Sequence, residues 1–225
     1  SKGFPTNGLF GFVNMITKII NEENPKLILV AFDIGKTFRH EQYEDYKGGR
    51  SETPDELKMQ FPVAKEILNA MGIKYLEVVG YEADDIIGTY AKMIDESQNY
   101  EGLIVSSDKD LLQLISNRVT VKLLKSKDYI MMDENKFMET YGVEPIRITD
   151  LKGLMGDASD NIPGVKGIGE KTAIKLLTEY QSLENLYQHI DDVKGATRTK
   201  LVDGRDSAFK SRDIATIFRD VPVNY

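Results

Sequence analysis

The first third of the chain alternates between helical and strand-like patterns of apolar positions. Apolar residues recur at helical spacing over residues 5–23, which predicts an amphipathic helix capped near Thr6. The apolar run 27–32 follows and ends at Asp33, as expected of a short strand buried on both faces of a parallel sheet. A capping box with proline at the first helical position then predicts a helix over residues 53–70.

The same alternation continues to residue 132. Further segments with a strand or helix pattern are strands 75–79 and 103–106, helices 82–94 and 108–115, and a late strand pair, 119–124 and 129–132. This order predicts an α/β fold with a parallel sheet flanked by helices and a functional site at the carboxyl ends of the strands. From residue 135 onward the pattern is helical, so we expect an α/β core over residues 1–144 and a helical subdomain over residues 145–225.

Residues 36–50 are rich in charged residues and tyrosine and contain almost no aliphatic residue, so we expect this stretch to project into solvent. Basic side chains can neutralise phosphates, and aromatic rings can stack on unpaired bases. The candidates for such contacts are Lys36, Arg39, Tyr43, Tyr46, Lys47 and Arg50. The alternative is a solvated charged loop, which the acidic residues in the same stretch keep open.

Composition limits the metal chemistry that is available. The chain has no cysteine and only two histidines, which excludes disulfides, thiolate nucleophiles and zinc sites rich in Cys or His. A metal ion must therefore be held by oxygen, which favours hard cations such as Mg²⁺, Mn²⁺ or Ca²⁺. The longest apolar run, 27–32, is far shorter than the roughly 20 residues of a membrane helix, so we expect a cytosolic protein without membrane contact.

Eight carboxylates stand where a strand ends or a helix begins, which is where such a fold builds its site. They are Asp33, Glu82, Asp84, Asp85, Asp108, Asp110, Asp157 and Asp160. Each cluster alone could simply complement a helix dipole. Together, the carboxylates would repel one another with an energy of about 4 kcal/mol per close pair, at about 4 Å and an effective dielectric constant of about 20, unless cations neutralise them. We therefore predict a pair of divalent ions, as in phosphoryl-transfer hydrolases.

The net charge of −7 does not argue against a nucleic-acid partner, because removing these eight charges leaves +1 for the rest of the chain. Residues 162–173 alternate glycines with apolar residues and then open a helix. Such glycines free backbone N–H groups to face a phosphate, and the helix N-terminus adds partial positive charge. Lys166 and Lys171 strengthen this helix-hairpin-helix pattern, for which the alternative is a tight turn.

These motifs resemble those of the 5′ nuclease (flap endonuclease) family, and most of all the 5′-3′ exonuclease domains of bacterial DNA polymerase I. The resemblance runs from about residue 3 to the C-terminus and is carried by AFDIGKTFRH, YKGGR, YEADDIIGT, SSDKDLLQL and KGLMGDASDNIPGVKGIGEKTAIKLL. It implies a PIN-like sheet with a helical arch over about residues 36–60 and metal-dependent hydrolysis of DNA near the 5′ ends of flaps or nicks. The resemblance also implies that the protein acts in DNA replication, including Okazaki fragment processing, and in repair, in the nucleoid of a bacterial cytoplasm.

The resemblance also assigns roles to single residues. It implies that Asp33, Glu82 and Asp84 surround a first Mg²⁺ or Mn²⁺ ion with Asp85 close by, that Asp108, Asp110 and Asp160 serve a second ion, and that Asp157 acts through water. Lys47 and Arg50 would reach the scissile phosphate from the arch, and Tyr46 would stack on a base. The hairpin that grips duplex DNA, with a K⁺ ion, would comprise Gly164, Val165, Lys166, Gly167, Ile168, Gly169, Lys171 and Thr172. A monomer, with a polymerase domain following in the full-length protein, is also implied.

One departure from the family leaves an alternative open. Family members begin with a strand that ends in a metal-binding aspartate, and this chain starts after it, at Ser1. A first ion that lacks this ligand would leave a module that recognises branched or nicked duplex DNA without cutting it. Activity on RNA, as in related PIN-type ribonucleases, is a further alternative, which the helix-hairpin-helix pattern disfavours. A plain metal buffer is the weakest, because no segment resembles an EF-hand loop.

Overall fold

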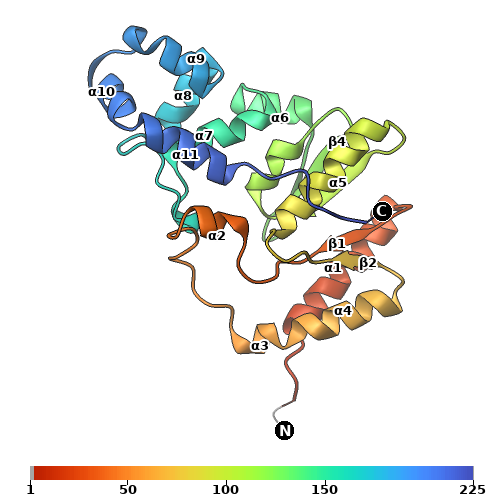
Figure 1. Ribbon diagram of the computed structural model, residues 1–225. Coiled ribbons are helices and arrows are strands. Elements are labelled where there is room, and N and C mark those ends of the chain that lie inside the picture. Colours follow the sequence, from red (N-terminus) through yellow and green to blue (C-terminus); the bar gives the residue numbers. More distant parts are fainter. Residues whose placement is uncertain (1–2, 225) are drawn as a thin grey trace.

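The computed structural model describes residues 3–224, in which the strands pair in two separate sheets (Figure 1). The strands are β1 (Leu29–Ala31), β2 (Lys74–Leu76), β3 (Gly102–Ser106), β4 (Val119–Leu124) and β5 (Tyr129–Met132). β1 pairs with β2 and β3 with β4 in parallel, whereas β4 and β5 are antiparallel. The predicted parallel pairing and late strand pair are thus confirmed. The strands form two separate parts, because among the described residues no strand joins β1 to β3.

The β1–β2 sheet is covered by α1 (Asn7–Glu23) and α4 (Gln60–Ala70), which also contact each other. Their apolar faces meet the sheet around the buried side chains of Ile16, Leu68 and Ile73. The predicted helical spacing in the first segment therefore corresponds to a core-facing stripe. β1 is half-buried where the sequence predicted burial on both faces, since it has one neighbouring strand among the described residues.

The helix predicted over residues 53–70 is divided into two. α3 (Asp55–Lys58) ends at Met59, and α4 begins directly after it. Pro62, in the first turn of α4, has no N–H to donate to the carbonyl of Lys58, which explains the break. The predicted capping box is wrong, because Pro54 occupies the N-cap position and no side chain caps α3.

The second sheet is flanked by α5 (Ala83–Ser97) and by a group of helices that fills the carboxyl-terminal third of the chain (Figure 1). Those helices are α6 (Glu134–Tyr141), α7 (Ile148–Met155), α8 (Glu170–Tyr180), α9 (Leu183–Gln188), α10 (Gly195–Asp203) and α11 (Arg205–Ala215). Short 3-10 turns link the elements: η1 (Lys109–Leu114), η2 (Pro145–Arg147), η3 (Ala158–Asp160) and η4 (Ile190–Asp192). The helical pattern after residue 135 is confirmed, whereas predicted helix 108–115 is a 3-10 turn.

One hydrophobic core crosses the predicted boundary near residue 145. Val121 on β4 and Phe137 on α6 belong to the same buried cluster as Leu154, Leu177 and Leu201 from the later helices. α5 packs on a second cluster, which includes Ala91 and Ile217. The helical region is therefore packed against the β3–β4–β5 sheet and is not a separate unit on a linker.

The stretch that follows β1 lies against the rest of the molecule. It contains α2 (Phe38–Gln42) and a series of turns before α3. The N–H of Phe38 donates to Gly80 O at 2.9 Å, and the N–H of Lys47 donates to Asp160 O at 2.9 Å. The prediction that the stretch projects into solvent is therefore wrong for its inner face, where Arg39 is 3 % and Tyr46 5 % exposed.

The segment after α11, residues 216–224, runs back past α5 towards β1 (Figure 1), and we call it the carboxyl-terminal strap. The N–H of Val221 donates to Thr89 Oγ1 at 3.0 Å, and Arg219 Nε donates to Gly88 O at 3.1 Å. A Cβ on Gly88 would lie 2.5 Å from Ile217 Cγ2, so the close approach of the strap requires glycine there.

Two further predictions concern a membrane-spanning helix and the first strand of the family. Among residues 3–224, no helix is both long and apolar enough to cross a membrane. The family's first strand would precede Ser1 and so lies outside the described residues.

Candidate metal centre

Carboxylates surround the N-terminus of α5, where the backbone N–H groups have no partner within the helix. Glu82 is the N-cap residue, and Asp85 accepts a hydrogen bond from the Glu82 N–H at 2.9 Å. Asp33, which follows β1, accepts one from the Ala83 N–H at 2.6 Å. The unpaired N–H groups and the positive end of the helix dipole favour acidic side chains at this position, which explains the local fold of the YEADD segment.

Two short turns supply the other carboxylates. Asp108 caps η1 and accepts a hydrogen bond from the Asp110 N–H at 2.8 Å. Asp157 caps η3 and accepts one from the Ser159 N–H at 2.9 Å, which leaves Asp160 at the end of the same turn. One oxygen from each of Asp110, Asp157 and Asp160 lies within 4.8 Å of the others. Hydrogen bonds within each turn thus orient its carboxylates, and the fold brings the two turns together.

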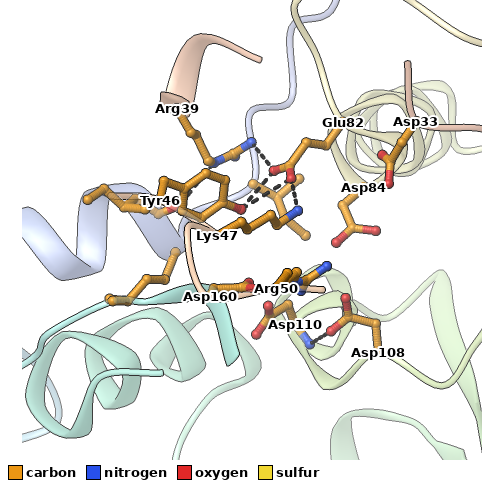
Figure 2. Close-up of a pocket in the computed structure, with 14 residues that line it drawn as sticks. Asp33, Arg39, Tyr46, Lys47, Arg50, Glu82, Asp84, Asp108, Asp110 and Asp160 are labelled. Atoms are coloured by element: carbon orange, nitrogen blue, oxygen red, sulfur yellow. Dashed lines mark hydrogen bonds and ion pairs between the residues drawn. The ribbon is translucent and has the colours of Figure 1, made fainter. Parts of the chain in front are cut away.

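These segments meet in one hollow, shown in Figure 2. The carboxylates that line it, which we call the carboxylate site, are Asp33, Glu82, Asp84, Asp108, Asp110 and Asp160. Asp157 adjoins them through Asp110 and Asp160. The structure thus brings seven of the eight predicted metal ligands together.

Basic side chains from residues 36–50 enter the same hollow. Lys47 forms an ion pair with Glu82, and Arg50 forms one with Asp160 (Figure 2). Lys47 is half-buried with a left-handed backbone (φ 56°), whereas the side chain of Arg50 is 51 % exposed. Both predicted catalytic cations therefore contact the carboxylates directly.

Lys152 is a site residue that the sequence analysis missed. Its Nζ lies 3.0 Å from Asp110 Oδ1, and it also forms an ion pair with Asp157. Burial acts to raise the pKa of Asp157, but hydrogen bonds from Lys152 and Ser159 outweigh it and lower that pKa. The sequence offered one indication of this contact, because Lys152 lies only five residues before Asp157, in the last turn of the helix that precedes it.

Acidic groups remain in excess around Asp84. Burial raises the pKa of Asp84 well above its usual range, and the carboxylates of Asp108 and Glu82 raise it further. Burial also raises the pKa of Asp110, although the ammonium group of Lys152 opposes this shift. Carboxylates crowded beyond what their basic neighbours neutralise are typical of functional sites.

Asp85 and Arg39 occupy different surroundings from those that the sequence predicted. Asp85 is fully buried, and both of its oxygens accept hydrogen bonds from Arg39, at 2.8 Å each. Asp85 does not line the hollow, because its oxygens accept hydrogen bonds from Arg39 and from backbone N–H groups. Arg39 is likewise too buried to meet a phosphate, because its guanidinium group is used inside the protein.

The other candidates from this stretch differ in exposure. Tyr46 is buried, and its hydroxyl donates to Glu82 Oε2 at 3.1 Å, which leaves its ring unavailable for stacking on a base in this arrangement. Tyr43 is half-buried, with Lys210 Nζ 4.9 Å from its ring centre. Lys36 is exposed. Of these candidates, Lys36 meets the expectation of a free surface side chain most fully.

The glycine-rich loop before α8 has a buried side and an exposed side. Val165 and Ile168 are buried in the main core cluster, so their side chains anchor the loop. Gly164 has φ 61°, and a Cβ there would lie 2.2 Å from Gly156 N, so close packing of two chain segments requires it. The exposed members of the predicted hairpin are Lys166, Gly167, Gly169 and Lys171, and Thr172 is half-buried.

The donor set of the carboxylate site suits a hard divalent cation. Every acidic side chain that lines the hollow offers oxygen, and neither histidine lines it. Asp110 Oδ1 is buried and, apart from its ion pair with Lys152, has no hydrogen-bond partner among residues 3–224. Oxygen donors of this kind fit Mg²⁺ or Mn²⁺.

Known proteins share this fold. The structure is similar to that of T5 5′-exonuclease with bound zinc, at a TM-score of 0.76 and 23 % identity, over 95 % of this chain and 82 % of that one. It is also similar to the catalytic core of Rad2 in complex with DNA substrate, at a TM-score of 0.62 and 20 % identity, over 96 % of this chain and 70 % of that one. Because both sequence identities are low, the similarity establishes the 5′ nuclease fold and nothing more specific.

Sequence comparison is more specific. The chain is 49 % identical to DNA polymerase I of Bacillus caldotenax over 226 aligned residues, which cover 99 % of this chain and 26 % of the polymerase. It therefore spans about a quarter of the length of the curated relatives it matches. Residues 1–142 match the 5′-3′ exonuclease N-terminal resolvase-like domain, and residues 143–225 match the 5′-3′ exonuclease C-terminal SAM fold. These two matches cover the whole sequence, and the chain belongs to the 5′-3′ exonuclease family.

Proposed function

We propose that this chain is a structure-specific 5′ nuclease that hydrolyses DNA phosphodiesters near the 5′ ends of flaps or nicks. The observation that carries the proposal is the carboxylate site, in which excess acidic charge lies next to two arch cations, Lys47 and Arg50. The family membership and the T5 and Rad2 folds support the same reaction class.

Two Mg²⁺ or Mn²⁺ ions would be held by opposite halves of the hollow. Asp33, Glu82 and Asp84 would hold one ion, and Asp108, Asp110 and Asp160 the other, with Asp157 acting through water. The ions, when bound, supply an activated water molecule and stabilise the leaving oxygen. T5 5′-exonuclease, which has this fold, is described with divalent zinc bound.

Lys47 and Arg50 have a role of their own in this proposal. Both side chains form ion pairs with carboxylates that a divalent cation would also contact. A bound cation would therefore weaken these ion pairs and leave Lys47 and Arg50 able to bind a phosphate. Hydrogen bonds from these cations to the scissile phosphate would offset negative charge as it develops during hydrolysis. The guanidinium group of Arg50 is more exposed than the amine of Lys47, so we assign the first contact with DNA to Arg50.

The loop before α8 would bind the duplex away from the cut. Lys166 and Lys171 are exposed beside glycines at the N-terminus of an 11-residue helix, a combination that suits a phosphate. We retain the K⁺ ion at this loop as a proposal from the family resemblance. The core anchors Val165 and Ile168 would keep the loop rigid as it contacts the DNA backbone.

The biological setting is proposed from the relatives. They are bacterial DNA polymerases I, which suggests replication, Okazaki fragment processing and repair in the nucleoid of the bacterial cytoplasm, and a polymerase domain as the partner in a longer protein. We further propose that the nuclease acts as a monomer.

Cleavage of a 5′-labelled flap duplex tests the function. Mg²⁺, Mn²⁺ and EDTA are compared, and binding without turnover is followed in Ca²⁺ by fluorescence anisotropy. Release of a short 5′ product in Mg²⁺ or Mn²⁺, and none in EDTA, is the expected result. Tight binding of the flap with no product under any condition would refute the nuclease and favour a DNA-recognition module.

A further inference from the structure

All three nitrogen atoms of the Arg39 guanidinium group donate hydrogen bonds to acceptors inside the protein. Nη1 donates to Glu82 Oε2 at 2.7 Å, and both Nη atoms donate to Asp85 at 2.8 Å. Nε donates to Ile214 O at 2.9 Å, and Nη2 to Thr216 O at 2.8 Å. The side chain, 3 % exposed, thus fixes one oxygen of Glu82 at the wall of the hollow (Figure 2).

Asp85 matches the charge of Arg39. Its two oxygens also accept the backbone N–H groups of Glu82 and Phe218, at 2.9 Å each. Because Arg39 and Asp85 form a neutral buried pair, Arg39 can orient Glu82 without cancelling its negative charge. The charge of Glu82 therefore remains available to a cation in the hollow.

Three chain segments hold Arg39 in place. α2 carries the residue, α5 supplies its carboxylates, and the end of α11 with the strap supplies its carbonyl acceptors. The ring of Phe218 on the strap packs with those of Phe38 and Tyr81, with ring centres 5.9 and 5.5 Å apart. A planar guanidinium fork fits these divergent acceptors, whereas an ammonium group has no such geometry.

We propose that Arg39 is a positioning residue of the metal centre, which orients the Glu82 carboxylate towards a bound divalent cation. This inference rests on the proposed function. Arg39 acts through Glu82 and makes no contact with DNA. The Glu82 oxygen that Arg39 does not bind, Oε1, is the one that Lys47 contacts, so it is the oxygen presented to the hollow.

The test measures Mn²⁺ binding to the protein without DNA, by electron paramagnetic resonance of free Mn²⁺, in Arg39→Lys and Arg39→Gln. Circular dichroism fixes a temperature at which each variant is folded. Changes behind metal ligands typically weaken metal affinity by roughly 10- to 100-fold, and we expect a loss in that range for both variants. Arg219→Gln is the matched control, since Arg219 also binds the α5 region from the strap but lies outside the hollow.

A double-mutant cycle with Glu82→Gln separates positioning from a general structural role. If Arg39 acts through Glu82, Arg39→Lys weakens Mn²⁺ binding in the wild-type background and has no further effect in the Glu82→Gln background. Equal losses in both backgrounds, or unchanged affinity in either folded Arg39 variant, would overturn the inference. Wild-type protein that binds no Mn²⁺ would overturn the metal centre itself, so the two failures are distinguishable.

Discussion

Two clusters of carboxylates in this molecule are neutralised in different ways. In the helical region, Arg212 contacts Asp150 at 3.0 Å and Glu184 at 2.6 Å, and we call these three residues the Arg212 cluster. Asp150 also accepts the Leu183 N–H at 3.1 Å. The hydrogen bond from Arg212 lowers the pKa of Glu184, which shows that the folded state favours its charged form.

The carboxylate site shows the opposite electrostatic behaviour. Six carboxylates line it among the described residues, against Arg39, Lys47 and Arg50, and Asp85 already matches Arg39. Burial and like charges raise the pKa of Asp84 there. Carboxylates with dedicated arginine partners therefore stabilise the fold, whereas carboxylates in excess repel one another, an arrangement that is typical of functional sites.

The largest effect is expected from removing a ligand of the carboxylate site. Asp110→Ala should lower flap cleavage in Mg²⁺ by more than about 100-fold, because changes behind metal ligands already cost roughly 10- to 100-fold. Binding of the flap in Ca²⁺ should be retained. Single-turnover cleavage and anisotropy measure the two effects, and Asp128→Ala, in the exposed turn between β4 and β5, is the control. Retained turnover in Asp110→Ala would refute its assignment as a ligand.

Removing a basic side chain from the hollow should separate chemistry from metal binding. Lys47→Met is expected to lower the cleavage rate by about 100-fold, the typical effect of losing one charge-stabilising donor. Its affinity for Mn²⁺ should not fall, because the amine competes with a cation for Glu82. Rapid-quench kinetics and Mn²⁺ titration give the two numbers, and a parallel loss of both would contradict the assignment.

Two isosteric substitutions should shift stability in opposite directions. Asp84→Asn removes one charge from the acidic excess, so the metal-free protein should gain about 1 kcal/mol and melt about 2–4 °C higher in EDTA. Asp150→Asn leaves Arg212 without its buried partner and should cost about 3 kcal/mol. Thermal melts in EDTA measure both. Shifts of the same sign would break the distinction between the two clusters.

The smallest effect concerns acid sensitivity in the Arg212 cluster. Because the folded-state pKa of Glu184 lies below its unfolded value, its stabilisation is present above that unfolded value and is lost as pH falls through the folded one. Glu184 is partly exposed, so Glu184→Gln should cost less than about 1 kcal/mol at neutral pH. The free energy of unfolding in urea at pH values from about 7 to about 3 should converge for wild type and variant. A constant difference at all pH values would argue against this ion pair.

Local patterns predicted much of the fold and of the acidic lining. The helices after residue 135 and the β4–β5 pair follow from apolar spacing alone. The proximity of Asp33 and Asp84 follows from the parallel pairing of β1 and β2, since the carboxyl ends of such strands share one edge. Asp110 follows β3 in the other sheet, and it approaches them because α5 contacts both β1 and β3. The break at Met59 also had a local signal, because Pro62 stands four residues after Lys58.

The long-range partners could not be predicted. Charge and tyrosine in residues 36–50 indicated an exposed stretch, but Arg39 is buried because Ile214 and Thr216, some 175 residues later, supply acceptors for it. Tyr46 is buried for a related reason, since it packs with Ile162 and Ile214. Sequence spacing shows neither contact, and the role of Lys152 likewise depends on the approach of Asp110 from another segment.

The carboxyl-terminal strap has a consequence for how the molecule comes apart. The two family matches divide the chain between residues 142 and 143, yet the strap returns from the second part to bind Thr89 and Gly88 on α5 of the first. Heat or denaturant cannot melt the helical part without also exposing the apolar face of α5 that Ile217 covers. The chain is therefore expected to unfold in a single cooperative transition, as one thermodynamic unit built from two evolutionary modules.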